Sequence, residues 1–234
     1  MRPITTIGFD ADDTLWHNER FFKLTEARFA DLLRDHAAPG DLAERLLNAE
    51  RRNLGRYGFG IKGFMLSMIE TALDVTNDRV PSTVIRGIVE AGQEMLAHPI
   101  ELLPHAADAV TALQADFYLV LITKGDLLDQ ERKLAQSGLG DAFDAVEFVS
   151  DKQAGTYAAI FDRHGDGAAQ GLMAGNSMKS DVLPMIAAGG HGVFVPHGDV
   201  WALEHAHPPQ SEPRFHELSH LGELPDLVRR LCGE

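Results

Sequence analysis

The sequence has very little cysteine and no long apolar run. Cys232 is the only cysteine among 234 residues, so no disulfide can form within the chain and a reducing compartment is favoured. No uninterrupted apolar run comes near the ~18 residues that a transmembrane helix needs. The opening MRPITTIGFD also lacks the apolar stretch of a signal peptide. We therefore expect a cytoplasmic protein with no membrane partner.

Positive charge is also scarce. The chain carries 21 Lys and Arg against 35 Asp and Glu, a formal net charge of −14. Because nucleic acids and anionic membranes require a basic face, neither is expected as the main partner. Apolar residues make up 44% and charged residues 24%, which is typical of a globular protein with a sizeable core. An acidic protein of this kind can hold an anionic substrate only by building a local positive site from single cations or a metal.

Short apolar segments alternate with helical patterns along most of the chain. Such alternation implies βαβ units and a parallel sheet. Near the end, residues 205–216 contain three prolines and are predicted to form an irregular surface loop before a last short helix. The predicted strands are residues 4–9, 117–123, 145–150, 171–176 and 191–196.

A helical insert interrupts this pattern directly after the first strand. The predicted fold is therefore α/β, a Rossmann-like parallel-sheet core of residues 1–16 plus 99–234 with an inserted all-helical domain of residues 17–98. Within the insert, the stretch LGRYGFGIKGF has four glycines and is predicted to be a loop or helix breaker. Arg56 and Lys62 lie in this stretch. They either belong to a solvated inter-helix loop or close over the site and bind an anionic substrate.

Polar residues follow the predicted strands at the points where the strands end. In an open parallel sheet, ligands bind at this edge. Asp10 and Asp12 follow the first strand, and the later strands run into TKG (123–125), DK (151–152) and NSMKSD (176–181). A nucleophile, an acid/base, a hydroxyl, a lysine and oxygen ligands for magnesium are thus predicted at one edge of the sheet.

These segments together resemble the four motifs of the haloacid dehalogenase (HAD) superfamily of hydrolases. FDADDT is similar to the first motif, DxDxT, and LITKG to the second, an apolar strand ending in Ser or Thr. Lys152 fits the third motif, and GNSMKSD resembles the acidic fourth. Each motif alone is weak, but four in order, each after an apolar strand, are specific. The resemblance covers about residues 1–16 and 99–200, and the insert stands where this family places a helical cap.

The resemblance implies that Asp10 is a nucleophile. It would attack phosphorus to form an aspartyl-phosphate, while Asp12 would protonate the leaving group and then activate the water that hydrolyses the intermediate. Because residues i and i+2 of a strand face the same way, the two carboxylates are expected to converge on one site. Thr123 and Lys152 would hold the phosphoryl oxygens.

The resemblance also implies a magnesium site. Its ligands would be the Asp10 carboxylate, the Asp12 backbone carbonyl, Asn176 and Asp181, directly or through water. Asn176 stands where the family usually has Asp. The lost negative charge predicts either weaker metal binding or a shift of direct ligation to Asp181.

The roles of Lys124, in the second motif, and of Trp16, just after the first, are each open to two interpretations. Lys124 stands where Asn is common and faces either the substrate or solvent, and Gly125 beside it is a further substrate-binding candidate. Trp16 either packs in the core or lines the pocket. The histidines show no compact ligand spacing, so the sequence does not predict a second metal site. These histidines are His191, His197, His205, His207, His216 and His220.

The predicted function is a magnesium-dependent phosphatase of a small phosphorylated metabolite, acting as a monomer or homodimer. A 2-haloacid dehalogenase on the same fold is the alternative, and it would need neither a metal nor an acid/base at Asp12. A phosphomutase would need a cap that recruits a phosphorylated intermediate. A degenerate, non-enzymatic binding module is disfavoured by the intact motif residues, although Asn176 keeps it open.

Overall fold

The structure, a computed structural model, describes residues 4–198 and 200–233. The chain forms two compact units. Over the described ranges, no helix combines the length and the apolar character needed to cross a membrane. The first unit comprises Met1–His17, Ile100–Lys124 and Gln130–Glu234, and the second comprises Asn18–Pro99 and Gly125–Asp129.

The first unit is built on a six-stranded parallel sheet in the order β3-β2-β1-β4-β5-β6. In β1, Phe9 pairs with Leu121 of β2 on one side and with Ala174 of β4 on the other. Since the chain goes from β1 to β2 on one side and reaches β4 on the other, the carboxyl ends of β1 and β4 flank the point where such sheets bind ligands. The predicted Rossmann-like α/β fold is confirmed. The strands are β1 (Thr6–Phe9), β2 (Tyr118–Lys124), β3 (Ala145–Val149), β4 (Gly171–Gly175), β5 (His191–Phe194) and β6 (Phe215–Glu217).

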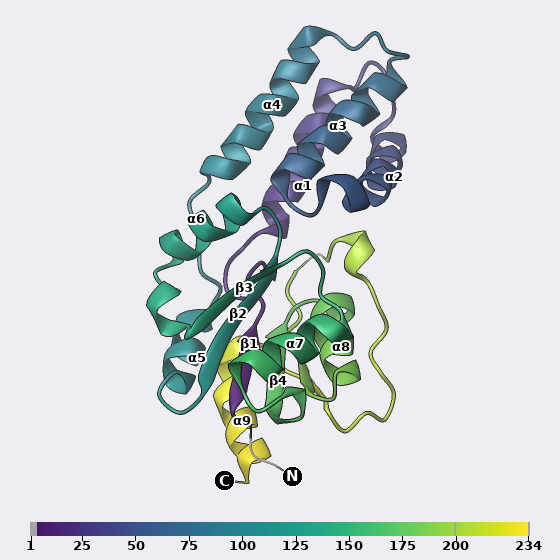
Figure 1. Ribbon diagram of the computed structural model, residues 1–234. Coiled ribbons are helices and arrows are strands. Elements are labelled where there is room, and N and C mark those ends of the chain that lie inside the picture. The colour runs from purple at the N-terminus through teal and green to yellow at the C-terminus, as the bar shows by residue number, and fades with distance from the viewer. Residues whose placement is uncertain (1–3, 199, 234) are drawn as a thin grey trace. The chain divides into compact units, whose positions relative to one another are not determined.

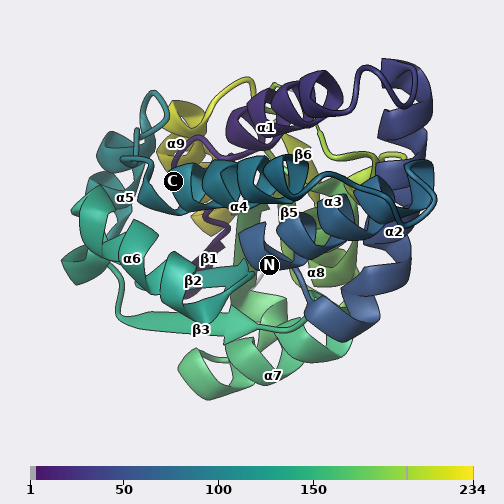
Figure 2. The same cartoon turned by 90° about the horizontal axis from the view of Figure 1, so that it is seen from above.

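Helices cover both faces of this sheet, because its strands carry apolar side chains on both faces. Phe9 and Leu121 pack on the face covered by α5 and α9, whereas Ile122 packs on the face covered by α7 and α8. Figure 1 shows these helices around the strands, and Figure 2 shows α7 and α9 on opposite sides of them. On the α7 face, a Cβ at Gly8 would lie 2.9 Å from the sulfur of Met173, so β1 has no room for a side chain there. The helices are α5 (Ala106–Leu113), α6 (Leu127–Ser137), α7 (Ala154–His164), α8 (Leu183–Ala187) and α9 (Leu224–Cys232).

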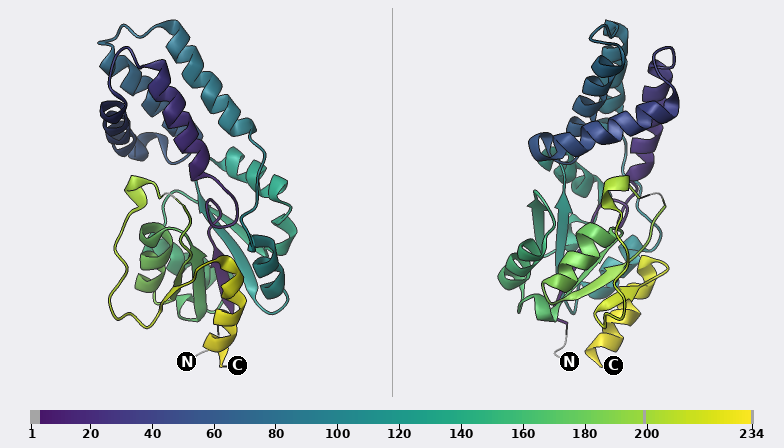
Figure 3. Two further views of the ribbon diagram at one scale, coloured as in Figure 1. Left: turned by 180° about the vertical axis from the view of Figure 1, so that it is seen from behind. Right: turned by 90° about the vertical axis from the view of Figure 1, so that its right-hand side faces the viewer.

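The second unit is helical and has a core of its own, which includes Phe29, Leu42, Met68 and Ile88. Figure 3 shows its helices from two further sides. The glycine-rich stretch is mostly helical, because α2 continues through Gly55 and the chain turns only over residues 58–60. The helices are α1 (Glu19–Leu32), α2 (Pro39–Tyr57), α3 (Ile61–Val75) and α4 (Ser82–Ala97).

Two segments differ in part from the sequence-based expectation. Residues 205–214 are irregular, in agreement with the prediction of a loop over residues 205–216. The last two residues of the predicted loop belong instead to β6, which is only three residues long and pairs with β5 at the sheet edge, too short for a periodic signal. Gly125–Asp129 was predicted to belong to the sheet core but groups with the helical unit. The reason is local, since Lys62 Nζ lies 2.9 Å from a carboxylate oxygen of Asp126.

Candidate active site

The loop after β1 is fixed by backbone hydrogen bonds. The Asp10 amide donates to the carbonyl oxygen of Ala174 at 2.9 Å, which holds the loop against the end of β4. The Asp13 amide donates to the Trp16 carbonyl at 2.7 Å, and Asp13 takes a left-handed φ of 59° to do so. Few L-residues adopt this conformation, and Asp is among those that tolerate it. The first motif is thus a tight, rigid turn at the ligand-binding edge of the sheet.

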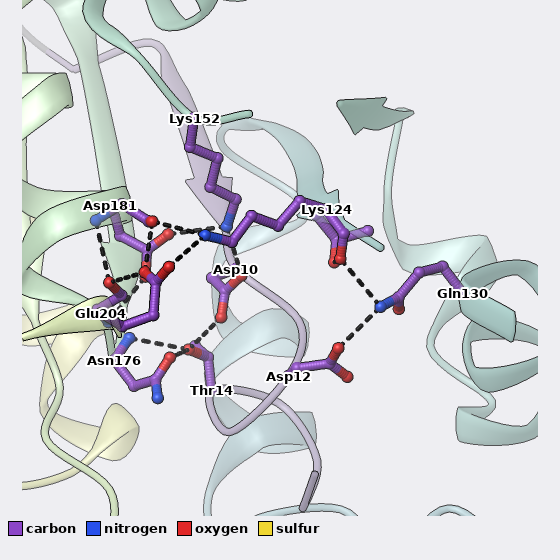
Figure 4. A network of polar contacts seen from close by, with 12 residues as sticks. Asp10, Asp12, Thr14, Lys124, Gln130, Lys152, Asn176, Asp181 and Glu204 are labelled. Carbon is purple, nitrogen blue, oxygen red and sulfur yellow. Dashed lines mark hydrogen bonds and ion pairs between the residues drawn. The ribbon is translucent and has the colours of Figure 1, made fainter. Parts of the chain in front are cut away.

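The carboxylate of Asp10 is at the centre of a buried network, shown in Figure 4. Asp10 is 7% exposed, and its Oδ2 accepts a hydrogen bond from Thr14 Oγ1 at 2.9 Å. Lys152 Nζ donates to Asp10 Oδ1 and also to Asp181 Oδ1, the latter at 2.8 Å. The other oxygen of Asp181 accepts from the Ser177 amide at 2.9 Å. One ammonium group therefore serves two buried carboxylates.

The charges of this network do not balance. Burial and the nearby Asp181 carboxylate raise the pKa of Asp10 to about 7, although Lys152 lowers it. Burial lowers the pKa of Lys152, but Asp10 and Asp181 more than offset this and raise it above its ordinary value. The site is therefore short of positive charge. The carboxylates of Asp10 and Asp181 and the amide oxygen of Asn176 are hard oxygen donors, so the residues present fit Mg²⁺.

Asn176 joins the end of β4 to the loop after β1. Its backbone amide donates to Thr14 Oγ1 at 3.0 Å, and its side-chain Oδ1 accepts from the same hydroxyl at 3.4 Å. Thr14 in turn donates to Asp10. The first and fourth motifs, 162 residues apart in the chain, thus meet through one threonine hydroxyl.

The carboxylate of Asp12 is held by three donors. Trp16 Nε1 lies 2.8 Å away, Gln130 Nε2 2.7 Å and Lys133 Nζ 3.0 Å. Burial raises the pKa of Asp12, but Lys133 and the two hydrogen bonds lower it below its ordinary value, so Asp12 is ionised at neutral pH. Strand alternation predicts that Asp10 and Asp12 face one site. Here the Asp12 side chain contacts α6 (Figure 4), because β1 ends at Phe9 and the alternation does not extend past it.

The second motif contacts the segment that contains Glu204, through the side chain of Lys124. Thr123 is buried at the end of β2, where it was predicted to meet a phosphoryl oxygen. Lys124 Nζ lies 2.6 Å from a carboxylate oxygen of Glu204 and 2.8 Å from Ser180 Oγ. The second oxygen of Glu204 accepts from Ser177 Oγ at 2.6 Å. Burial raises the pKa of Glu204, but Lys124 and the serine hydroxyls lower it overall. Lys124 is thus held in a polar cluster rather than directed only to solvent.

The predicted cap residues lie in the helical unit. Arg56 is in the last turn of α2, and Lys62 is in the first turn of α3, where it pairs with Asp126. Gly125, the other substrate-binding candidate, has a φ of 138° and begins the segment that groups with this unit. Substrate binding by Arg56, Lys62 and Gly125 stays a prediction.

The family model of the haloacid dehalogenase-like hydrolases matches residues 4–189. This chain belongs to that family. A haloacid dehalogenase-like family hydrolase of Xanthomonas campestris is 40% identical, with a TM-score of 0.86 over 99% of this chain and 97% of that one. The chain matches no curated protein sequence.

Two more distant solved structures show a likeness in fold. The 2-haloacid dehalogenase of Pseudomonas syringae pv. Tomato is 19% identical, with a TM-score of 0.62 over 97% of this chain and 99% of that one. A predicted phosphoglycolate phosphatase of Haemophilus somnus is 16% identical, with a TM-score of 0.65 over 96% of this chain and 98% of that one. Proteins of either description therefore share the fold of this HAD-like hydrolase.

The structure adds residues to this HAD-like site that the sequence motifs do not contain. Gln130 and Lys133 are three residues apart on α6, so they share a helix face. This spacing is the one sequence feature that could have indicated that both side chains contact the site. Ser180 lies inside the fourth motif, but nothing in the sequence links it to Glu204. Glu204 precedes the proline-rich segment and gives no pattern at all. Trp16 is fully buried in the core, and its indole nitrogen also donates a hydrogen bond to Asp12, so Trp16 both packs in the core and contacts a residue of the site.

Proposed function

We propose that this HAD-like hydrolase is a magnesium-dependent phosphatase that hydrolyses a small phosphorylated metabolite in the cytoplasm, as a monomer or homodimer. One observation carries the proposal. Asp10 is a buried carboxylate at the ligand-binding edge of the sheet, paired with Lys152, and a second carboxylate follows two residues later at Asp12. A phosphate ester needs both a nucleophile and a group that moves protons, and the first motif supplies both.

The first half-reaction transfers the phosphoryl group to the protein. An oxygen of Asp10 attacks phosphorus, the bond from phosphorus to the leaving oxygen breaks, and an aspartyl-phosphate forms. Lys152 and Thr123 hold the phosphoryl oxygens and offset the repulsion between Asp10 and the substrate. Asp12 protonates the leaving oxygen. Because the contact with Lys133 keeps Asp12 ionised, its carboxylate must leave Lys133 and take up a proton before it acts as an acid.

The second half-reaction restores Asp10. Water attacks the phosphorus of the aspartyl-phosphate and breaks its bond to Asp10, while the ionised Asp12 takes the proton of the water. Asp10, Asp181, Asn176 and the Asp12 backbone carbonyl would hold Mg²⁺. When bound, the ion supplies the positive charge that two buried carboxylates and a phosphate need beyond Lys152.

The helical unit is proposed to act as the cap of this hydrolase. It would exclude water and select the leaving group, with Arg56 and Lys62 as cations for an anionic substrate. Lys124 and Gly125 would contribute from the second motif. Lys124 can reach a substrate only if the substrate competes with Glu204 for its ammonium group.

The second candidate function, a 2-haloacid dehalogenase, is favoured by one specific contact set. The carboxylate of Asp12 already binds Trp16, Gln130 and Lys133. In a dehalogenase Asp12 would only hold these neighbours in place and would transfer no proton. In this reaction Asp10 attacks the carbon that carries the halogen, halide leaves, and water hydrolyses the resulting ester. No proton has to be given to the leaving group.

A two-substrate assay distinguishes these functions. We expect phosphate release from p-nitrophenyl phosphate and from members of a phosphorylated-metabolite panel, dependent on added Mg²⁺ and lost with EDTA. We expect no halide release from 2-chloropropionate under either condition. Halide release that survives EDTA, without phosphate release from any ester, would establish the dehalogenase and reject the phosphatase.

Asn176→Asp is expected to bind Mg²⁺ more tightly than the wild type. The substitution adds a negative charge beside Thr14, next to the Asp10 carboxylate, and an ionised oxygen is a stronger Mg²⁺ ligand than an amide oxygen. Calorimetric titration of both proteins with MgCl₂ measures the effect, for which we expect at least about a tenfold lower Kd. Equal affinities would show that position 176 is not a ligand and would transfer that role to Asp181.

A further inference from the structure

Three residues outside the proposed phosphatase machinery bring their donor atoms together. Asp13 and His17 come from the loop after β1, and His197 comes from the segment after β5. Their ligand atoms all lie within 4.8 Å of one another. We propose that Asp13, His17 and His197 bind one transition-metal ion of the zinc class. The sequence did not predict this site, because 180 residues separate the two histidines.

The separation of the two imidazole nitrogens supports this proposal. His197 Nε2 lies 3.3 Å from His17 Nδ1. Two nitrogens bound to a tetrahedral Zn²⁺ at about 2.0–2.1 Å are about 3.3–3.4 Å from each other. The two rings are tilted by 56° with their centroids 5.1 Å apart, so they are not stacked face to face and their nitrogens can point at a common ion.

The backbone holds all three ligands in place. Asp13 is fixed by its left-handed φ and by its hydrogen bond to the Trp16 carbonyl. The His17 amide donates to the Glu101 carbonyl at 3.0 Å. His197 comes two residues after Val195, whose amide donates to the carbonyl of Gly175 at 2.9 Å. Because the ligands are positioned before the ion arrives, little chain entropy is lost on binding.

Burial and ligand chemistry define the kind of ion. Asp13 is buried, whereas His17 and His197 are half-buried, so solvent reaches the cluster and can fill a fourth position. Imidazole nitrogens favour Zn²⁺ and its neighbours over Mg²⁺, which prefers oxygen. The cluster is therefore chemically distinct from the all-oxygen ligand set of Asp10, Asn176 and Asp181. A bound ion would tie the loop after β1 to the segment after β5.

The test is metal binding by the full chain in an excess of MgCl₂, which occupies oxygen-only sites. We expect the wild type to bind one equivalent of Zn²⁺ by calorimetry and to give the intense visible absorption of tetrahedral Co²⁺. His17→Gln and His197→Gln should each weaken Zn²⁺ binding by at least about tenfold and abolish the Co²⁺ band. The matched control, His207→Gln, replaces an exposed histidine and should bind like the wild type.

Other results overturn the proposal. A wild type that takes up no Zn²⁺ would show that the imidazoles share a proton instead of a metal. Equal Zn²⁺ affinity in the wild type, His17→Gln and His197→Gln would place the ion elsewhere. Asp10→Asn should keep the Zn²⁺ site intact, and its loss in that variant would mean that the ion sits at the proposed magnesium site. Folding of every variant is checked by circular dichroism, and Asp13→Asn gives an independent third ligand deletion.

Discussion

Asp10→Asn is expected to abolish turnover while making the metal-free protein more stable at pH 8. The substitution removes the proposed nucleophile, and we expect a loss of at least about a thousandfold in kcat. The stability effect follows from the pKa of Asp10, which is raised from 3.8 to about 7. A carboxyl group with a raised pKa binds its proton more tightly in the folded than in the unfolded state. Its contribution to stability is therefore present below pH 3.8 and is lost as the pH rises through about 7.

At pH 8 the ionised, buried carboxylate of Asp10 therefore destabilises the folded wild type to its full extent. A neutral amide at this position removes that destabilisation. We expect a gain of about 1–2 kcal/mol in the free energy of unfolding, shrinking toward zero near pH 4. Urea denaturation in EDTA at pH 5 and pH 8 measures this gain. Asp226→Asn, which changes an exposed carboxylate paired with Arg229, is the control and should show no such pH trend. Retained turnover in Asp10→Asn, or a stability loss that grows with pH, would contradict the assignment of Asp10.

Lys152→Met is expected to destabilise the protein by about 3–5 kcal/mol at pH 8, because it leaves two buried carboxylates without their shared ammonium group. Lys152 is 4% exposed, and its partner Asp181 is 1% exposed. The loss should be smaller at pH 5. This pH lies below the pKa of about 7 that Asp10 has even with Lys152 present, so in the variant Asp10 takes a proton and the repulsion falls.

Two further variants isolate the cause of this loss. The double variant Lys152→Met with Asp10→Asn should recover part of the lost stability at pH 8, since only one buried carboxylate remains. Lys23→Met is the matched control, because Lys23 also pairs with two carboxylates, Glu19 and Glu26, but is 41% exposed. Its cost should stay below about 1 kcal/mol. Equal losses in Lys152→Met and Lys23→Met would show that the buried network has no special electrostatic role.

The fold and the central residues of the site could be predicted from the sequence for one physical reason. Buried parallel strands are continuous apolar runs, so β1, β2 and β4 are visible as such, and the polar residue after each run must lie at the same edge of the sheet. This reasoning places Asp10 and the segments that contain Lys152 and Asp181 at that edge, and the resemblance to the HAD motifs singles out Lys152 and Asp181 within those segments. β6 could not be predicted, because three residues at a sheet edge carry no periodicity.

The partners of Asp12 and Lys124 could not be predicted in the same way. Gln130 and Lys133 reach Asp12 from a helix, and Glu204 reaches Lys124 from an irregular segment 80 residues further along the chain. Such contacts depend on the path of loops and on side-chain rotamers, for which the sequence has no periodic signal. The cluster of Asp13, His17 and His197 was missed for the same reason.

The position of β1 in the middle of the sheet has a consequence for how the protein is made. β1 is synthesised first, yet Thr6 pairs with Tyr118 on one side and with Gly171 on the other. At about 5–20 residues per second, a ribosome reaches β4 on the order of 10–30 s after β1. The helical residues 18–99 are complete before β2 is made, and until β2 is made the apolar β1 has no neighbouring strand. Asp10, which directly follows β1, therefore gains the second of its two flanking strands only when most of the chain has been made.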